Sequence, residues 1–306
     1  MSTITIATRG SALALWQANH IKSLIEQNNP GIEVLLNIIK TTGDKILDVP
    51  LAKIGGKGLF VKEIETALLA NEADLAVHSM KDVPVELPAE LEIYANPSPE
   101  KPNDAFLSIK YNSINELPDG AVVGTSSLRR KLQLKAIKPN IRTEELRGNV
   151  NTRIQKMVDG QYDAIILAQA GLERLELVEH IKQTIPVDLM LPAVCQGVLG
   201  IEIRKGDTRT MEIIKCLKDL ESEKRVAAER AFLTKLEGGC QAPIACHAVI
   251  SGDKLSMTGY LSDLEGETVI MKRREGASID AATVGRMLAE DILADGGDKI
   301  LKAIYI

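Results

Sequence analysis

Two segments of this chain repeat one order of residues, and this order constrains the fold more than any other feature. Residues 3–7 and 121–124 are short runs rich in β-branched side chains, which are typical of buried strands. A turn with hydroxyl groups and arginine follows each run, as Thr8-Arg9-Gly10-Ser11 and as Thr125-Ser126-Ser127-Leu128-Arg129-Arg130. A helical period of apolar residues then begins. Strand, polar turn and helix in this order predict an α/β fold.

The alternation of strands and helices continues beyond these two segments. Further strands are expected at residues 33–40, 74–77, 141–145 and 163–168, and helices at 11–27, 60–70, 127–137 and 150–159. Such alternation favours a parallel or mixed sheet with helices on both faces. Prolines at 97, 99 and 102 indicate a crossing from a first unit to a second, and Pro186 and Pro192 indicate the way back. Ile201-Glu202-Ile203 is then one more strand of the first unit.

A different pattern begins near residue 220. A helix is expected around Val226 and Phe232, followed by strands near 244–251, 255–262 and 267–273 and a closing helix at 280–294. The sequence therefore predicts the α/β class, with two α/β lobes that flank a cleft and a small α+β C-terminal domain. The expected boundaries are 1–97 with 198–217, 103–193, and 220–306. Ligands of such folds bind at strand ends that line the cleft.

The polar turns suit a small anion. Backbone N–H groups at a helix start favour negative charge, and hydroxyl groups and guanidinium groups add donors for carboxylate or phosphate oxygens. The alternative for Thr125, Ser126 and Ser127 is plain N-capping. Six basic residues lie in glycine- or hydroxyl-rich loops, which favours a ligand over simple solvation: Arg9, Lys53, Lys57, Arg129, Arg130 and Arg147.

Composition excludes several other classes of protein. A net charge of -5 and an aromatic content of 3% argue against a broad nucleic-acid surface. No apolar run is long enough to span a membrane, and the chain starts directly with a strand, so we expect a cytoplasmic protein. The cysteines at 195, 216, 240 and 246 show no CxxC spacing and histidine is scarce, so no metal site is expected.

Asp82 is the first candidate for catalysis. It follows Lys81 at the end of a predicted buried strand, in a loop that Pro84 stiffens. A carboxylate among cations stays ionised, and it can stabilise a cation that develops on a substrate or accept a substrate N–H. The alternative is a structural aspartate that closes a turn.

Two further motifs stand out. Arg147 and Arg153 flank Gly148, which lets a ligand approach the backbone, and the alternative for these arginines is surface solvation. Cys240 follows two glycines, so its thiol is expected to be exposed and to serve as a reactive group or a covalent attachment point. Most free cysteines are instead buried small hydrophobes. A cysteine protease is disfavoured, because His247 is the only later histidine.

Six motifs, in order along the whole chain, resemble those of the porphobilinogen deaminases, also called hydroxymethylbilane synthases. They are Thr8-Arg9-Gly10-Ser11-Ala12-Leu13-Ala14, Gly55-Gly56-Lys57-Gly58-Leu59-Phe60, His78-Ser79-Met80-Lys81-Asp82-Val83-Pro84, Gly124-Thr125-Ser126-Ser127-Leu128-Arg129-Arg130, Leu146-Arg147-Gly148-Asn149-Val150 and Gly238-Gly239-Cys240-Gln241. The resemblance implies a monomer with two lobes like those of periplasmic solute-binding proteins. It implies a transferase of haem biosynthesis with a dipyrromethane cofactor bound to Cys240 by a thioether. Four porphobilinogen units would join this primer with loss of ammonia, and hydrolysis would release the tetrapyrrole 1-hydroxymethylbilane.

The resemblance also implies roles for individual residues. Asp82 would stabilise the azafulvenium cation that remains when ammonia leaves, and would bind pyrrole N–H groups. Cofactor carboxylates would be held by Ser79, Lys81, Thr125, Ser127, Arg129 and Arg130. The substrate and the growing chain would be held by Arg9, Ser11, Arg147 and Arg153, with Lys53 and Lys57 in a loop able to close over the cleft.

The chain departs from the family pattern at two places. Cys195 stands where the family usually has glycine, and a positive φ there would cost a residue with a side chain roughly 1 kcal/mol or more. The run Pro99-Glu100-Lys101-Pro102-Asn103-Asp104 lacks the arginines common in relatives, so inter-domain ion pairs are expected to be absent.

The second hypothesis for the function is a non-catalytic carboxylate-binding protein. A nucleic-acid-binding protein is the last of the three hypotheses.

Overall fold

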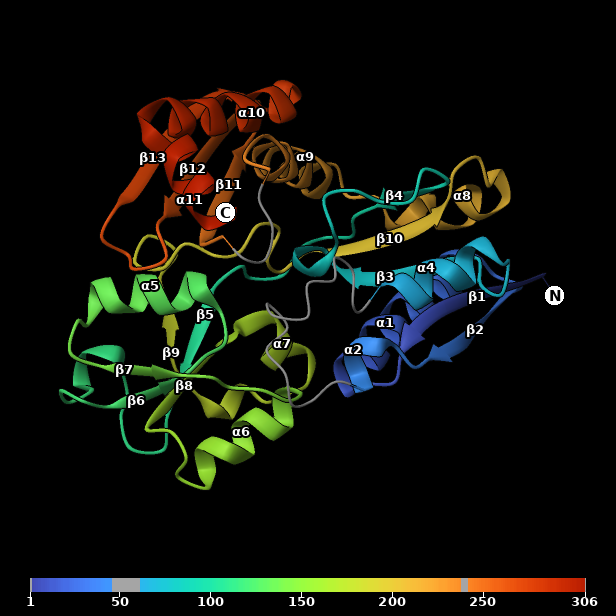
Figure 1. Cartoon of the computed structure of the whole chain (residues 1–306). Coiled ribbons are helices and arrows are strands. Elements are labelled where there is room, and N and C mark those ends of the chain that lie inside the picture. The colour runs from blue at the N-terminus through green and yellow to red at the C-terminus, as the bar shows by residue number, and fades with distance from the viewer. Residues whose placement is uncertain (1, 46–60, 238–241, 306) are drawn as a thin grey trace. The chain divides into compact units, whose positions relative to one another are not determined.

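The computed structural model describes residues 2–45, 61–237 and 242–305. The chain divides into two compact units, residues 1–100 with 198–223 and residues 101–197 with 224–306 (Figure 1). The division into three domains stays a prediction. Lys53, Lys57, the glycine-rich loop at 55–58 and Cys240 lie outside the described residues. None of the described helices has the length and apolarity needed to cross a membrane.

The first unit is built on a five-stranded mixed sheet with the order β2-β1-β3-β10-β4. Its strands are β1 (Ser2–Arg9), β2 (Ile32–Ile39), β3 (Leu75–Ser79), β4 (Leu91–Ala95) and β10 (Leu199–Arg204). β1 is parallel to β2 and β3, whereas β10 is antiparallel to β3 and β4. The strand expected at 201–203 is β10, and it joins this sheet as predicted.

Helices cover both faces of this sheet, which explains why its central strands are apolar on both sides. The helices are α1 (Ala12–Asn28), α2 (Thr42–Lys45), α4 (Lys62–Leu69) and α8 (Thr208–Ile214). Ile21 and Ile25 of α1 are fully buried in one core with Ile4 and Ile6 of β1. Ile64 and Leu68 of α4 form the core on the other face, with Ala76 of β3.

The sheet of the second unit has the order β7-β6-β8-β5-β9, which repeats the first arrangement. Its strands are β5 (Asp104–Leu107), β6 (Val122–Gly124), β7 (Arg142–Glu144), β8 (Ala164–Ala168) and β9 (Ile181–Ile185), and its helices are α5 (Leu128–Ile137), α6 (Val150–Val158) and α7 (Gln169–Arg174). In both sheets the second strand, β1 or β6, has a parallel neighbour on each side, and an antiparallel strand and an edge strand follow. The similarity of the two sequence segments therefore reflects two similar sheets.

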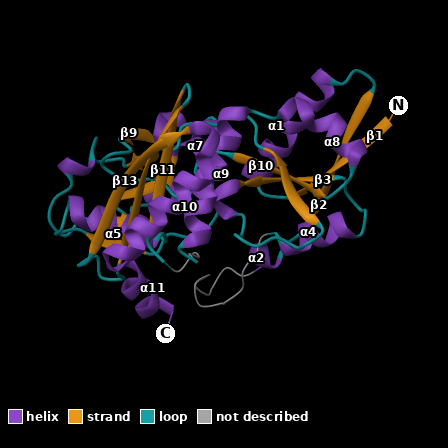
Figure 2. Cartoon of the chain, turned by 90° about the horizontal axis from the view of Figure 1, so that it is seen from above, coloured by secondary structure: helices purple, strands orange, loops and turns teal. Residues whose placement is uncertain are grey.

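The C-terminal part of the second unit is a three-stranded antiparallel sheet with helices on one face. The strands are β11 (Ile244–Ser251), β12 (Lys254–Ser262) and β13 (Val269–Ala277). The helices are α9 (Leu220–Lys235), whose first residues up to 223 belong to the first unit, α10 (Ala281–Ile292) and α11 (Asp298–Tyr305). α10 packs on β12 and β13 (Figure 2). A side chain at Gly285 of α10 would put its Cβ 1.9 Å from the carbonyl oxygen of Ala228, so only glycine allows α9 and α10 to approach this closely.

Cys195 has the conformation that its glycine-like position suggested. Its φ is +58°, in the left-handed region, and the residue is 1% exposed. The backbone N–H of Cys195 donates to Glu229 Oε2 at 2.5 Å, while Arg225 and the N–H of Ala248 donate to Oε1 of the same carboxylate at 2.9 and 3.0 Å. Burial and the Glu229 charge raise the pKa of the Cys195 thiol well above its usual value. The thiol is therefore protonated and unreactive, and the turn is fixed by its backbone.

Substitutions of Cys195 test the strain of this turn. Cys195→Gly and Cys195→Ala both remove the sulfur, but only alanine keeps a Cβ in the left-handed region. This strain outweighs the greater freedom of glycine in the unfolded chain, so we expect the alanine variant to be less stable by about 1 kcal/mol. Equilibrium unfolding in urea measures the difference.

Cys246 provides the control, because it is equally buried but lies in the extended strand β11. The order should be reversed there, with Cys246→Gly less stable than Cys246→Ala. The same order at both positions would show that the Cys195 backbone is not strained.

Candidate active site

The predicted residues of the first unit lie at the carboxyl ends of two adjacent parallel strands. Arg9 is the last residue of β1, and Ser11 follows as the N-cap of α1, with its Oγ accepting from the N–H of Ala14 at 3.3 Å. Ser79 is the last residue of β3, and Met80–Asp82 form a 3-10 turn after it. Because β1 and β3 are parallel neighbours, these groups share one edge of the sheet.

Asp82 is exposed on a turn that other groups hold in place. Val83 N–H donates to the carbonyl of Met80 at 3.2 Å, so the backbone closes the turn. Gln17, which is 4% exposed, donates to Ser79 Oγ at 2.8 Å. Lys81 is half-buried beside the exposed Asp82. The turn therefore presents an exposed carboxylate at the edge of the sheet.

The hydroxyl groups after β6 are bound within the second unit. Ser127 is the N-cap of α5, with its Oγ accepting from Arg130 N–H at 3.4 Å, so the capping alternative is right for its local role. Thr125 is 2% exposed, and its Oγ1 accepts from Ser127 N–H at 3.3 Å. Ser126 Oγ donates to the carbonyl of Leu146 at 2.8 Å. A serine that caps a helix through its oxygen still has its own O–H to donate to a ligand.

Arg129 and Arg130 converge on a residue that the sequence did not single out, Asp104 in β5. Arg129 Nη1 lies 2.7 Å from Asp104 Oδ2, and Arg130 Nη2 and Nε lie 2.7 and 3.1 Å from Oδ1. The three residues are at most 7% exposed. Burial raises the pKa of Asp104, but the charges and hydrogen bonds of the two arginines more than offset this and hold it well below the usual range. We call these three residues the Asp104 cluster.

Neighbouring polar groups form further hydrogen bonds with the Asp104 cluster, but one buried donor of the cluster has no partner. Arg129 Nη1 also donates to the carbonyl of Leu191 at 2.7 Å, and Gln196 Nε2 donates to Asp104 Oδ1 at 3.0 Å. Arg129 Nε is buried and has no hydrogen-bond partner. One carboxylate faces two guanidinium groups, which leaves an excess positive charge and the unpaired Nε donor of Arg129 in a nearly dry site. Such a site favours an anionic ligand.

Arg147 lies in the loop between β7 and α6, and Arg153 lies in the first turn of α6, at the same edge of the sheet as the turn after β6. Arg147 Nε lies 3.8 Å from Glu145 Oε2, and Arg153 Nε donates to the carbonyl of Gly148 at 2.7 Å. Gly148 has a φ of +112°, which few other residues adopt. Asn149 caps α6, with its side chain accepting from Thr152 N–H. Both arginines are half-buried at the surface of the unit.

The predicted site residues thus form one group in each unit. Arg9, Ser11, Ser79, Lys81 and Asp82 lie at strand ends of the first unit, and Thr125, Ser127, Arg129, Arg130, Arg147 and Arg153 lie at or just after strand ends of the second. Asp104 and Gln196 were missed. The signal for Asp104 was a lone carboxylate ahead of the apolar run Ala105-Phe106-Leu107, since a buried strand keeps a charge only where it is paired.

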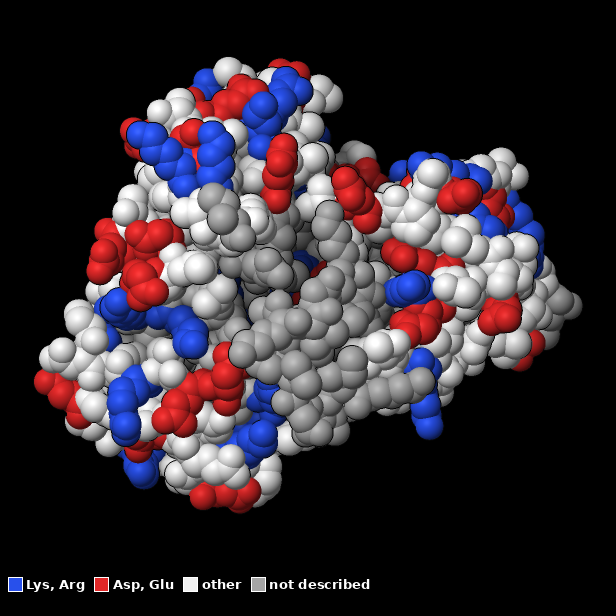
Figure 3. Space-filling view, in the orientation of Figure 1, with Lys and Arg blue, Asp and Glu red and all other residues white. Residues whose placement is uncertain are grey.

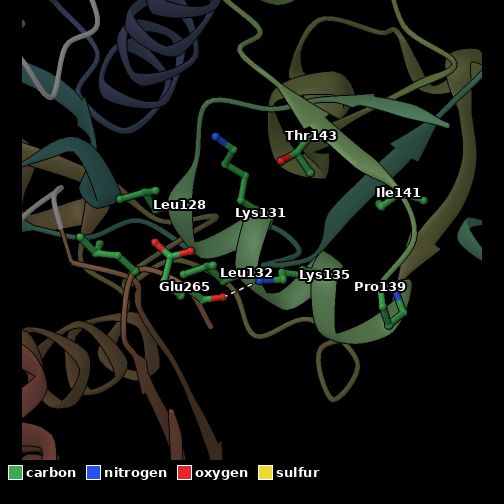
Figure 4. A pocket seen from close by; sticks show the side chains of 9 residues that line it. Leu128, Lys131, Leu132, Lys135, Pro139, Ile141, Thr143 and Glu265 are labelled. Carbon is green, nitrogen blue, oxygen red and sulfur yellow. Dashed lines mark hydrogen bonds between the residues drawn. The ribbon is translucent and has the colours of Figure 1, made fainter. Parts of the chain in front are cut away.

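A pocket of about 240 Å³ lies on another face of α5, and it contains none of the predicted residues (Figure 4). Leu128, Lys131, Leu132 and Lys135 of α5 line it, together with the turn between β12 and β13. Lys135 Nζ donates to the carbonyl of Glu265 in that turn at 2.8 Å. The pocket therefore marks the contact between α5 and the C-terminal sheet, away from Arg129 and Arg130.

Asp104→Asn tests whether the Asp104 cluster organises the second unit. The variant leaves two buried guanidinium groups without a countercharge, so the free energy of unfolding should fall by about 3–5 kcal/mol. Because the pKa of Asp104 is lowered on folding, the stability that it contributes is complete above roughly pH 4 and is lost as the pH falls further. Urea unfolding at pH 7 and at lower pH measures both effects.

The control is Asp119→Asn, an exposed carboxylate of the same lobe that accepts from Asn140 at 3.0 Å. It should change the free energy of unfolding by less than about 0.5 kcal/mol. Equal changes in the free energy of unfolding in the two variants would mean that the buried ion pairs of Asp104 contribute no more to stability than an exposed carboxylate does.

Solved structures that resemble the chain include a putative methionine-binding lipoprotein from Bacillus subtilis. It is 13% identical, with a TM-score of 0.44, over 72% of this chain and 92% of that one. The methionine-binding protein MetQ is 15% identical, with a TM-score of 0.45, over 74% of this chain and 94% of that one.

Sequence comparisons give much closer matches. The family model for the porphobilinogen deaminase dipyrromethane cofactor binding domain matches residues 4–212, and the model for the porphobilinogen deaminase C-terminal domain matches residues 223–294. The porphobilinogen deaminases of Maridesulfovibrio salexigens and of Nitratidesulfovibrio vulgaris strain Hildenborough are each 53% identical over 100% of this chain, covering 99% and 98% of their own lengths. The chain therefore belongs to the porphobilinogen deaminase family and is an enzyme with the dipyrromethane cofactor binding domain of that family.

Proposed function

We propose that this enzyme joins four porphobilinogen molecules on a dipyrromethane primer attached to Cys240, with Asp82 as its catalytic residue, and releases 1-hydroxymethylbilane by hydrolysis. The observation that supports this most is the Asp82 carboxylate itself, exposed beside Lys81 on a turn that the backbone closes. A carboxylate that is not consumed in closing its own turn is available to a substrate.

The residues present fit a dipyrromethane, which carries four carboxylate groups. The Asp104 cluster has an excess positive charge, and the buried Arg129 Nε has no hydrogen-bond partner. Lys81, Ser79, Thr125, Ser127, Arg129 and Arg130 would hold these carboxylates. When bound, the cofactor supplies the pyrrole carbon on which the product chain grows. Cys240 would hold it through a thioether, and this cysteine lies outside the described residues.

Asp82 acts on the substrate where positive charge develops. When the carbon–nitrogen bond of the protonated aminomethyl group of porphobilinogen breaks, ammonia leaves with the electron pair and an azafulvenium cation remains. An ionised carboxylate that accepts a hydrogen bond from the pyrrole N–H stabilises this cationic ring more than it stabilises the uncharged pyrrole ring of the substrate.

The remaining cations orient the substrate and the growing chain. Porphobilinogen carries an acetate and a propionate, and guanidinium groups bind carboxylates through paired hydrogen bonds. Arg9 and Ser11 in the first unit and Arg147 and Arg153 in the second would take this role. Lys53 and Lys57 would add charge from a loop outside the described residues.

We further propose that the enzyme is a cytoplasmic monomer that binds neither nucleic acid nor membranes. The net charge of -5 supports the part of this proposal that concerns nucleic acid, since it opposes association with polyanions. On the face shown in Figure 3, basic and acidic side chains are interspersed rather than gathered in a basic surface.

Asp82→Asn removes the negative charge with little change in shape. We expect the dipyrromethane to remain attached, while ammonia release from porphobilinogen falls by about 100-fold or more. Intact mass and a timed ammonia assay measure the two properties. Glu90→Gln, which changes an exposed carboxylate in the following loop, should retain normal turnover. Near-normal turnover in Asp82→Asn would refute the catalytic role.

Covalent attachment is tested by the mass of the denatured protein. We expect an added mass equal to two linked pyrroles derived from porphobilinogen, lost in Cys240→Ser and retained in Cys216→Ser, because Cys216 is an exposed cysteine without the glycine-rich context. Peptide mapping locates the modified residue. A chain that stays unmodified and inactive with porphobilinogen would favour a carboxylate-binding protein without catalysis.

A further inference from the structure

The first unit contains a buried pair of titratable side chains that the proposed chemistry does not use. His78 Nε2 and Glu202 Oε2 lie 2.8 Å apart, and the two side chains are 6% and 1% exposed. The second oxygen of Glu202 is buried without a hydrogen-bond partner. Burial of two ionisable side chains carries a desolvation penalty, which a pair of apolar side chains would avoid. Stability alone therefore does not explain why histidine and glutamate occupy these two positions.

The pair lies on the α4 side of the sheet. His78 shares the face of Ala76, because alternate residues of a strand point to the same side, and Ala76 packs in the core that α4 forms. Glu65 of α4 faces the pair. Burial and the charge of Glu202 raise the pKa of Glu65, and the charge of His78 lowers it. The imidazole therefore lies among carboxylates from two different elements.

Three contacts hold the end of β3 and the turn that follows β3. They come from alternate residues, Val198 just before β10 and Gly200 and Glu202 within it. The carbonyl of Val198 accepts from Met80 N–H at 2.9 Å. Met80 packs over Gly200 so closely that a Cβ there would lie 2.2 Å from the sulfur of Met80. Glu202 binds His78, four residues before Asp82. Two contacts thus hold the first residue of the turn, and the third holds the strand that leads into it.

We propose that His78 and Glu202 are positioning residues for Asp82: their side-chain hydrogen bond locks the end of β3 onto β10 and thereby fixes the turn that carries Lys81 and Asp82. This inference rests on the proposed role of Asp82. Neither side chain needs to touch substrate, because a carboxylate displaced by about 1 Å can cost roughly 100-fold in rate.

Glu202→Ala and Glu202→Gln test the hydrogen bond. In the alanine variant we expect kcat for ammonia release to fall by about tenfold or more, while KM stays within about threefold and the cofactor mass is retained. Glutamine keeps an oxygen that accepts from Nε2–H, so Glu202→Gln should recover kcat to within about threefold of the parent enzyme. A merely structural role would lower the folded fraction without this separation of kcat from KM and without rescue.

Asp74→Asn is the matched control. Asp74 precedes β3 at its other end, where its Oδ2 accepts from the N–H of Thr5 at 2.7 Å. This variant should lose stability without loss of kcat. If Glu202→Ala does not fold, Gly200→Ala tests the same link from the side of Met80, and we expect lower kcat with the cofactor retained.

The two proposals fail in different ways. The positioning role would be overturned by an unchanged kcat in folded Glu202→Ala, or by a Glu202→Gln variant that fails to recover kcat. Where Gly200→Ala is needed, an unchanged kcat in that variant would also overturn it. Each of these results counts against the positioning role even if Asp82→Asn is inactive. Normal turnover in Asp82→Asn would instead overturn the catalytic assignment, whatever the Glu202 variants do.

Discussion

The second unit depends on one buried carboxylate. Asp104 neutralises part of the charge of Arg129 and Arg130 at the start of α5, and through Gln196 it also ties down the segment that leads back to the first unit. Without Asp104, two guanidinium groups would face each other in a nearly dry interior, where like charges repel strongly. With it, the site keeps a single excess positive charge. A protein that binds polycarboxylates needs an excess of positive charge, and this charge attracts an anion more strongly in a nearly dry interior than in water.

In both sheets, the polar residues after a parallel strand can cap the next helix and also offer donors to an anion. Each sheet places polar groups where parallel strands end, and three of the helices that follow, α1, α5 and α6, begin with a capping hydroxyl or amide at Ser11, Ser127 and Asn149. Two of these caps, Ser11 and Ser127, are also residues that we propose bind carboxylates. A serine oxygen satisfies a helix N–H while its hydrogen remains available, so a stable helix start and an anion site do not compete.

The sequence predicted elements with strong local signals and missed those that depend on distant partners. α5, α6, β8 and β11 agree with their expected ranges to within a residue or so, because capping residues and β-branched runs mark them. β5 and β9 were not expected, since one begins with a charged residue and the other carries Lys182, Gln183 and Thr184 between its apolar ends. The Asp104 cluster was invisible for the same reason: its partners lie some 25 residues apart, and only folding brings them together.

The route of the chain through the two sheets has a consequence for synthesis. β4 ends at Ala95, but its neighbour β10 begins only at Leu199, after the whole of the second sheet. A ribosome delivers the amino-terminal strands first, so they wait beside an unfilled gap in their sheet while another lobe is translated and folds. Exposed strand edges of this kind attract unwanted pairing. The nascent chain is thus most vulnerable to aggregation in the interval before β10 emerges, and chaperones that shield strand edges would matter most for it then.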